Sequence, residues 1–514
     1  MFQKTIRAAT LSCIALLVAG YAHWLFTAPG LNIASVAASF LACLLFAGVG
    51  AGAIQRIFFE WEGASEVDVH ERLGRRSLRP ARFHPVRNLF LALLLARVLV
   101  YILAYVLSIL TTGYEGALLN TLSLWLKGDA PHYMGLASNG YVNAGDPRFH
   151  IVFLPFYPML VGIFNQFVNN TFVSGLFLST VFTVFAGMLL YELALCDMDT
   201  FTARRAVKFQ MLLPAAFLLN APMSDGLFLL LTILCMLLAR KKQFALACMV
   251  GAFAAFTRLQ GVLLLLPLLV ELVGEARRRK RAFGSMRNMI PAFFALLFVP
   301  LGVLAYLYVN WNITGDPFMF LTYQREHWSQ QMSWFFNTAS YQTTNFLTKF
   351  RSDIAEAFGL WLPNLATLLL APAVMLYALY KKPAEPDDED EDEESSEAKA
   401  APAQSLFDPE EEESAPGAPD FRKSYRDMLG IDKIVSRPYP LRASYLVYFL
   451  AYYFVSMGAT WLLSAPRYML CCFPLSLALA SSVRRRGSVA VAFTLLAVLQ
   501  LLYMRAYVMG WPVY

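Results

Sequence analysis

The sequence predicts an all-α, multi-pass membrane protein. Of its 514 residues, 58% are hydrophobic and only 15% are charged, whereas a soluble chain has about 45–50% apolar and about 25% charged residues. The apolar residues also fall in blocks of about 20, the length that a helix needs to cross a bilayer; residues 89–110 and 290–309 are clear examples. These blocks lack the alternating pattern of a membrane barrel, so helices are the expected spanning form.

The N-terminal region predicts two successive helices. Residues 8–27 are apolar and follow Lys4 and Arg7, a pattern that also fits a signal peptide. A second apolar block, residues 33–54, follows at once. This arrangement favours a first helix that is retained in the protein.

Clusters of lysine and arginine predict the topology, because cytoplasmic loops carry an excess of these residues. Placing all the clusters inside leaves residues 111–150 and 312–351 as large outer loops, and residues 220–225, 258 and 464–467 as short outer vertices. The clusters are Lys4 with Arg7, residues 72–87, Arg204 with Arg205 and Lys208, residues 240–242, residues 277–281, Lys381 with Lys382, and residues 484–486.

This topology requires several short helices. Between Lys242 and Arg277 the chain must leave the cytoplasmic side and return, which allows two helices of about 13–16 residues rather than the roughly 20 of a full span. The same holds for residues 209–239 and 443–483. Irregular backbone at such depth requires a protein or water cover, so polar residues at these apices are site candidates. We expect about 11–13 transmembrane or re-entrant helices, and residues 151–168 are a re-entrant candidate.

The charge pattern divides the chain into three parts. Residues 385–420 hold 16 acidic residues and one lysine, a net charge of −15, although the whole chain has a formal charge of +6. Residues 382–436 are therefore expected to form a disordered, acidic cytoplasmic insert, with a regulatory or partner-binding tail as the alternative. Residues 1–381 form the transmembrane core, and residues 437–514 supply its C-terminal helices.

The first outer loop contains an acid and a histidine three positions apart. Asp129 and His132 would share a face of one helical turn, and a carboxylate beside an imidazole suits a general base. Tyr133 and His150 belong to the same loop. The alternative role of Asp129 is to cap the following helix, which has Pro131 near its first turn.

Arg258 is the clearest polar anomaly, because it lies within a long apolar run and an intramembrane arginine is costly. Guanidinium groups suit phosphate, which they can grip with two parallel hydrogen bonds. The alternative is an arginine that extends from a helix end to the outer interface. Arg467 repeats the pattern at another predicted apex. Asp225 either orients one of these arginines or a substrate hydroxyl, or caps a helix after Pro222.

The second outer loop adds His327, Trp328 and Trp334. The tryptophans either stack on a sugar or belong to the interfacial aromatic belt. Histidines 132, 150 and 327 lack the tight spacing of a metal site, so no metal site is predicted, although a divalent metal stays an open alternative. The seven cysteines include no C-x-x-C pair and suit buried apolar positions. A P-loop, a dinucleotide-binding glycine turn and a G-x-S-x-G elbow are all missing from the sequence.

Taken in order, several segments resemble the GPI mannosyltransferase 2 (PIG-V-like) family of membrane glycosyltransferases, which includes bacterial relatives. The resemblance covers about residues 97–474 without the acidic insert. Gly128 stands where the family usually has Trp, and Asp225 where it has Glu. The matching segments are Asp129 to Tyr133, Asn139 to Tyr141, Phe153 to Pro158, Ser224 with Asp225, Thr257 to Gly261, Gly315 to Pro317, Gln324, Trp328, Arg467 with Tyr468, and Phe473 with Pro474.

The resemblance implies a C-type glycosyltransferase fold, and an enzyme that transfers mannose from a polyprenyl-phosphate donor with inversion. It makes Asp129, with His132, the catalytic candidate. Arg258, Arg467 and His327 become candidates for binding the donor phosphate. The substrate-binding candidates are Tyr133, His150, Asp225, Gln260, Trp328 and Tyr468. A lipid-linked donor is the only cofactor-like molecule expected, and membrane lipids are the expected surroundings.

The resemblance leaves the acceptor open among a glycolipid, a cell-wall polymer and a protein, and no nucleic acid is expected as a partner. The active site should lie on the extracytoplasmic face of a bacterial plasma membrane, or of the endoplasmic reticulum in a eukaryote. Two other functions compete. A lipid or solute transporter would explain the helices and intramembrane arginines, and a non-catalytic membrane subunit is the third reading.

Overall fold

The computed structural model describes residues 2–62, 84–283, 287–381, 441–483 and 485–513. Across these ranges the chain is helical and has no β-strand, only an isolated bridge between Met332 and Ala459. This confirms the all-α prediction. The predicted acidic insert, residues 382–436, lies outside the described residues. The basic stretch 72–87 also lies outside them, except for residues 84–87.

Eight helical segments among the described residues are long and apolar enough to cross a membrane. Together they confirm a multi-pass membrane protein, and α1 and α2 coincide with the two predicted N-terminal helices. The segments are built on α1 (Phe2–Thr27), α2 (Ile33–Glu62), α4 (His84–Thr112), α7 (Thr171–Leu195), α11 (Leu265–Phe283), α13 (Phe298–Thr314), α17 (Leu362–Tyr380) and α23 (Arg486–Val508).

Several of the remaining helices are short, as the spacing of the basic clusters predicts. They include α8 (Thr200–Leu212), α9 (Asp225–Arg240), α10 (Phe244–Thr257), α20 (Ala443–Met457) and α22 (Pro474–Ser482). At about 1.5 Å per residue, the 16 residues of α9 rise about 24 Å, less than the roughly 30 Å of a hydrocarbon core. The expected 11–13 helices therefore divide into eight full-length spans and several shorter elements, whereas α11 is longer than expected.

The first outer segment folds into η1 (Leu118–Trp125), α5 (Ala130–Asn139), η2 (Asp146–Val152) and α6 (Phe156–Val168). The axes of η2 and α6 differ by 114° across a short break, the geometry of a broken span or a re-entrant loop. The predicted re-entrant turn near residues 151–168 is consistent with this bend.

The second outer segment differs from a simple loop. It contains α14 (Met319–Glu326) and α15 (Phe335–Ser352), and α15 packs along α2. Trp24 Nε1 donates to Asn337 Oδ1 at 3.0 Å, and the ring of Phe335 lies 4.7 Å from that of Phe46. The cause is an apolar face on α15 that includes Phe335, Phe336 and Ala339, all fully buried.

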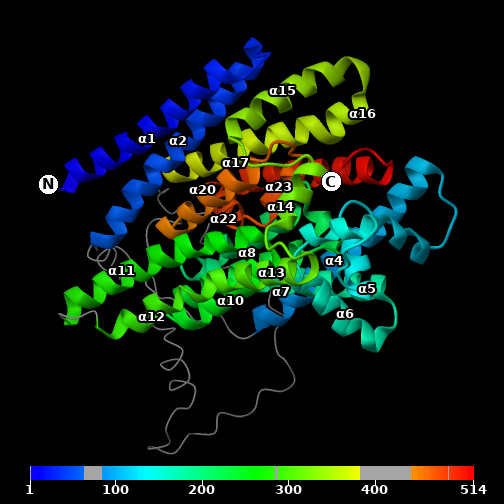
Figure 1. Cartoon of the computed structure of the whole chain (residues 1–514), viewed down its shortest axis with the longest axis horizontal. Coiled ribbons are helices and arrows are strands. Elements are labelled where there is room, and N and C mark those ends of the chain that lie inside the picture. Colours follow the sequence, from blue (N-terminus) through cyan, green and yellow to red (C-terminus); the bar gives the residue numbers. More distant parts are fainter. Residues whose placement is uncertain (1, 63–83, 284–286, 382–440, 484, 514) are drawn as a thin grey trace, which may run out of the picture.

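The predicted cytoplasmic ends of several helices converge at one end of the bundle, to the left in Figure 1. There Arg240 at the end of α9 lies 2.5 Å from Asp197, and Arg442 before α20 donates to Glu271 of α11 at 2.8 Å. The predicted outer apices meet at the opposite end of α9. This grouping agrees with a topology in which the described basic clusters share one side.

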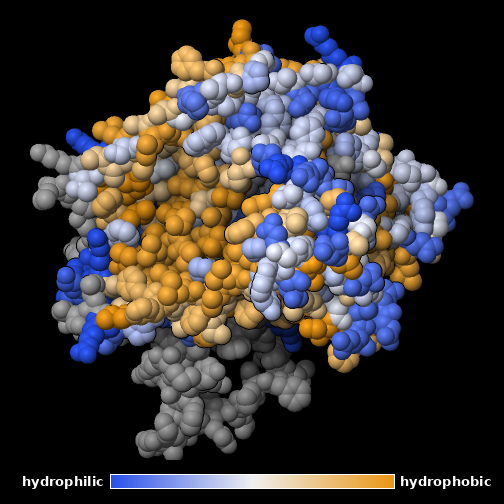
Figure 2. Space-filling model, in the orientation of Figure 1, coloured by the Kyte–Doolittle hydropathy of each residue, from blue (hydrophilic) through white to orange (hydrophobic). Residues whose placement is uncertain are grey.

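The surface between the two ends is apolar. Figure 2 shows a broad orange area across the centre of this face, with polar residues at its left edge and over its right side. The long helices also expose apolar side chains, for example Leu95 and Leu110 of α4. A contiguous apolar face of this kind suits contact with lipid chains.

The topology can be tested with single cysteines in a chain that carries Cys13→Ser, since Cys13 is the exposed cysteine of the seven. We expect Ala144→Cys, exposed between α5 and η2, to react with a membrane-impermeant maleimide in intact cells. Lys280→Cys, exposed near the end of α11, should react only after permeabilisation. The opposite labelling pattern would invert the topology, and the parent Cys13→Ser chain measures background labelling.

Candidate functional site

Four charged side chains form a continuous ionic chain, one from the first predicted outer loop and three from the predicted apices. Arg467 Nη1 donates to Asp129 Oδ2 at 2.6 Å, and Arg467 Nε donates to Asp225 Oδ2 at 2.9 Å. The second oxygen of Asp225 accepts from Arg258 Nη1 at 2.8 Å. Two carboxylates and two guanidinium groups thus alternate in the order Asp129, Arg467, Asp225, Arg258, and we call this set the ionic chain.

Each member of the ionic chain lies at a helix break. Asp129 directly precedes α5, Asp225 is the first residue of α9, and Arg467 lies in the six-residue helix α21 (Ala465–Leu470). Arg258 has an extended backbone, with φ of −151°, between α10 and η4 (Leu259–Leu264). Short helices therefore end where these four side chains meet.

The segment that carries Arg467 is held by its neighbours. Asn364 Oδ1 of α17 accepts a hydrogen bond from the backbone nitrogen of Ala465 at 2.8 Å. Gln342 Nε2 of α15 donates to the carbonyl oxygen of Leu462 at 2.6 Å. Both amides are buried, so α15 and α17 jointly position the start of α21.

Burial is unequal along the ionic chain. The exposed fractions of the side chains are 1% for Asp225, 3% for Arg467 and 10% for Arg258, against 34% for Asp129. A buried charge is tolerated where it is paired and hydrogen-bonded, and this condition holds for the three inner members. The chain is therefore accessible mainly at its Asp129 end.

The geometry does not match the alternative roles predicted for Asp129 as a helix cap and for Arg258 as an interfacial arginine. The Asp129 carboxylate makes no capping hydrogen bond to α5 in the described chain, and its partner is Arg467. The Arg258 side chain stays inside, 5.7 Å from the ring centroid of Tyr468 and 5.9 Å from that of Phe228, rather than extending to an interface. Asp225 bonds both arginines from the first turn of α9.

Two further polar groups complete the inner part of the site. The hydroxyl of Tyr133 lies 2.7 Å from that of Ser224, the residue before Asp225. Arg258 Nη1 also lies 3.6 Å from Cys471 Sγ. The sequence analysis did not assign Cys471, and its position four residues after Arg467 was the available signal.

Beside Asp129, aromatic and imidazole rings from both outer segments form an aromatic cluster. His132 Nδ1 lies 3.0 Å from His150 Nε2, and the His132 ring stacks on Phe153 with centroids 5.1 Å apart. From the second outer segment, His327 stacks on Phe149 at 4.0 Å and Trp328 lies 5.8 Å from His132. The cluster consists of His132, Phe149, His150, Phe153, His327 and Trp328.

The surroundings of His132 disfavour its charged form. Burial lowers its pKa from the ordinary value of 6.5, and this effect outweighs the opposite influence of the Asp129 carboxylate. In the short contact with His150, one ring nitrogen donates and the other accepts. Both observations favour a hydrogen-bonding role for His132 over a cationic one.

The other predicted site residues divide between these two groups. Tyr468 lies with the ionic chain, whereas His150 and Trp328 belong to the aromatic cluster. His327 also belongs to the cluster, where it contacts the rings of Phe149 and Trp328 and not the two arginines with which it was grouped. Gln260 is half-buried on η4, and its role stays a prediction. Trp334 stacks on Phe336, away from both groups.

Two buried polar features were missed by the sequence analysis. Arg97, in the middle of α4, donates to Asn220 Oδ1 at 3.2 Å and receives a hydrogen bond from Asn220 Nδ2 at its carbonyl oxygen. The rule that flagged Arg258 would also have flagged Arg97. Glu271 of α11 pairs with Arg442 at the predicted cytoplasmic end. No group of three or more metal-ligating side chains occurs in the part of the chain that the structure describes.

The fold and the site together define a multi-pass helical membrane protein with an ion-paired centre at one end of its short helices. No family model, no curated protein and no solved structure matches the chain.

The two carboxylates should differ in their effect on stability. Asp225→Asn leaves two buried arginines with one neutral partner, and we expect the free energy of unfolding to fall by about 3–5 kcal/mol. Asp129→Asn, at the exposed end, should cost about 1 kcal/mol or less. Thermal unfolding of the purified proteins in detergent measures both effects. Equal losses of Tm would contradict the burial argument.

The lowered pKa of His132 predicts a pH-dependent stability. The unfolded chain, with a histidine pKa of about 6.5, binds this proton more readily than the folded protein, so stability is lost as the pH falls below about 6.5. We expect the Tm of His132→Asn to decline less between pH 7 and 5 than that of the wild type. Parallel declines would show that His132 does not contribute.

Proposed function

We propose that the protein is a membrane glycosyltransferase that moves a hexose from a polyprenyl-phosphate donor to an acceptor hydroxyl, on the extracytoplasmic face, with inversion. The observation that carries the proposal is that Arg467 bonds the most accessible carboxylate, Asp129, while its other nitrogens face buried Asp225. One guanidinium group thus lies next to a candidate base and can also contact a phosphate.

Asp129 is proposed as the general base. Its carboxylate takes the proton of the acceptor hydroxyl as the acceptor oxygen forms a bond to the anomeric carbon, and the bond from that carbon to the phosphate oxygen breaks. The leaving phosphate keeps the electron pair and gains one negative charge, while Asp129 loses one. Because Arg467 contacts Asp129, its positive charge can stabilise the new charge on the phosphate.

The donor phosphate is proposed to approach Arg467 and Arg258. The Nη2 atom of Arg467 is buried 2.9 Å from Asp225 Oδ2 and has no well-oriented acceptor in the described chain. It is proposed to donate to a phosphate oxygen once the donor has entered the site. Asp225 holds both arginines before substrate binds. Such preorganised donors contribute to catalysis because they need not be reoriented during the reaction.

The aromatic cluster is proposed to border the acceptor. His132 follows Asp129 by three residues at the start of α5, and it contacts His150, Phe153 and Trp328. Trp328 is half-buried and His327 is exposed, so ring faces and imidazole nitrogens from two segments are proposed to contact the acceptor. Rings with polar edges suit sugars, which present both C–H faces and hydroxyl groups. Mannose as the donor sugar follows from the resemblance alone.

The base assignment predicts a strong loss of activity in Asp129→Asn. With purified protein, radiolabelled polyprenyl-phosphate-mannose and candidate lipid acceptors, we expect transfer to fall by about 10²–10⁴-fold, the usual contribution of a general base. Asp146→Asn, an exposed acid of the same outer segment, is the matched control and should retain activity. Unchanged transfer by Asp129→Asn would remove the assignment, and substrate transport without transfer would favour a transporter.

A further inference from the structure

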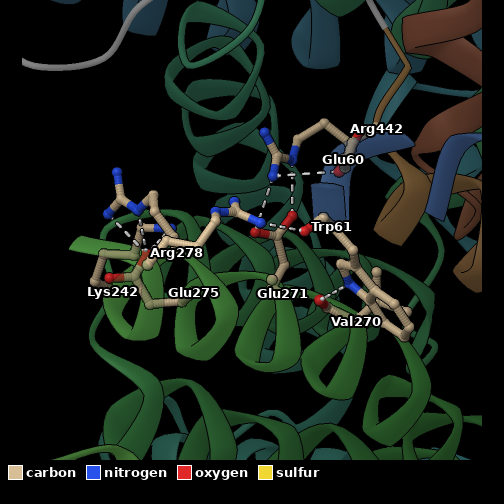
Figure 3. Close-up of a pocket in the computed structure, with 10 residues that line it drawn as sticks. Glu60, Trp61, Lys242, Val270, Glu271, Glu275, Arg278 and Arg442 are labelled. Carbon is tan, nitrogen blue, oxygen red and sulfur yellow. Dashed lines mark hydrogen bonds and ion pairs between the residues drawn. The ribbon is translucent and has the colours of Figure 1, made fainter. Parts of the chain in front are cut away.

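A second charged site lies at the opposite, predicted cytoplasmic end of the bundle, apart from the ionic chain. It is a partly open pocket between the ends of α2 and α11 (Figure 3). Four cations and three carboxylates line it, together with Trp61, Val270 and Gly274. The cations are Lys242, Arg278, Arg281 and Arg442, and the carboxylates are Glu60, Glu271 and Glu275.

The inner half of the pocket holds one cation between two carboxylates. Arg442 donates to Glu271 from Nε at 2.8 Å and lies 3.4 Å from Glu60. Figure 3 shows Arg442 reaching both carboxylates, which come from different helices. These side chains are all at most 10% exposed. This half ties α2, α11 and the start of α20 together.

The outer half has an excess of positive charge. Glu275 is the shared partner of Lys242 at 3.0 Å, Arg278 at 2.7 Å and Arg279 at 2.9 Å. One carboxylate therefore faces three cations, and the Arg278 side chain is 49% exposed. Such a surplus favours an anionic ligand, because the ligand's charge offsets the repulsion among the cations.

Trp61 places this outer half at the level of lipid headgroups. Its Nε1 donates to the carbonyl oxygen of Val270 at 3.1 Å, and the Arg277 guanidinium lies 4.7 Å from its ring centroid. Arg281 Nη1 donates to the carbonyl oxygen of Trp61 at 2.7 Å. The two candidate spans Ile33–Trp61 and Leu259–Arg281 both end here. Tryptophan and basic residues at span ends are typical of the membrane interface.

Helix α11 also carries exposed apolar side chains. Leu266 and Leu269 are 44% and 42% exposed, and they lie two to three turns before Arg277 and Arg278 on the same helix. They do not line the pocket, and Leu269 points to a different face of α11 than Gly274 and Arg278, which do. Acyl chains would therefore run along the side of α11 while the phosphate is held at its basic end, a contact that a soluble anion would not make.

We propose that the outer half of the pocket, formed by Trp61, Lys242, Arg278 and Arg281, binds the phosphate of an anionic phospholipid in the cytoplasmic leaflet. The cations contact the phosphate oxygens, and the acyl chains lie along α11. Basic pockets at the cytoplasmic ends of membrane helices are suited to such headgroups. This site is independent of the proposed transfer reaction, because it uses none of its residues.

The test uses the full chain purified in a neutral detergent and titrated with dioctanoyl phosphatidylglycerol, with bound lipid counted by native mass spectrometry. The double variant Arg278→Gln/Arg281→Gln should bind about tenfold more weakly or worse, since each basic residue near a membrane surface contributes measurably to binding. The control Lys241→Gln/Lys280→Gln removes two exposed lysines at the same end that do not line the pocket. It should stay within about twofold of the wild type.

Equal weakening in the two double variants would overturn the proposal, because it would indicate a general charge effect. Equally tight binding of dioctanoyl phosphatidylcholine would also overturn it. If inorganic phosphate at the same concentration displaced the anionic lipid completely, the ligand would be a free phosphate and the lipid assignment would be wrong. Unchanged Tm values confirm that the variants are folded, and lipid binding that survives Arg278→Gln/Arg281→Gln would likewise exclude this pocket.

Discussion

The architecture of the site depends on one constraint, which is that a charge removed from water must be paired. Asp225 is almost completely buried and accepts from two arginines on different apices. A carboxylate in this position brings Arg258 and Arg467 into a fixed relation, although these residues are far apart in the chain. The short helices α9, α10 and α21 end at this point because their polar ends have partners there.

Both ends of the bundle hold paired charges, but the two networks differ in how exposed they are. At one end the ionic chain remains open through Asp129, which is a third exposed. At the other end Asp197, Arg240, Glu271 and Arg442 are all buried and joined by ion pairs. Helix α9 connects the two networks, with Asp225 at its first residue and Arg240 at its last. The buried network holds the helices in place, whereas the ionic chain has one carboxylate that solvent can reach.

Much of the architecture could be predicted from the sequence, because apolar block length and the spacing of basic clusters are local properties. They indicated the short helices and the apices at residues 220–225, 258 and 464–467. The order in which the charged side chains pair could not be predicted, because it depends on how each helix is rotated about its axis. No feature of the neighbouring sequence places Asp225 between two arginines. For the same reason His327 was grouped with the arginines, whereas its ring stacks on Phe149. The burial of α15 against α2 was missed because its polar residues suggested a loop.

Some consequences of the fold reach beyond the residues that touch the site. The turn before Arg467 is held by Asn364 and Gln342, two buried amides on α17 and α15. Helix α15 in turn packs on α2, so the N-terminal helices support the position of a guanidinium group that they do not contact. Inherited or engineered changes in this N-terminal pair can therefore shift Arg467 while all four charged side chains of the ionic chain stay intact. Sequence variation there should be interpreted as variation in the alignment of the ionic chain rather than in its composition.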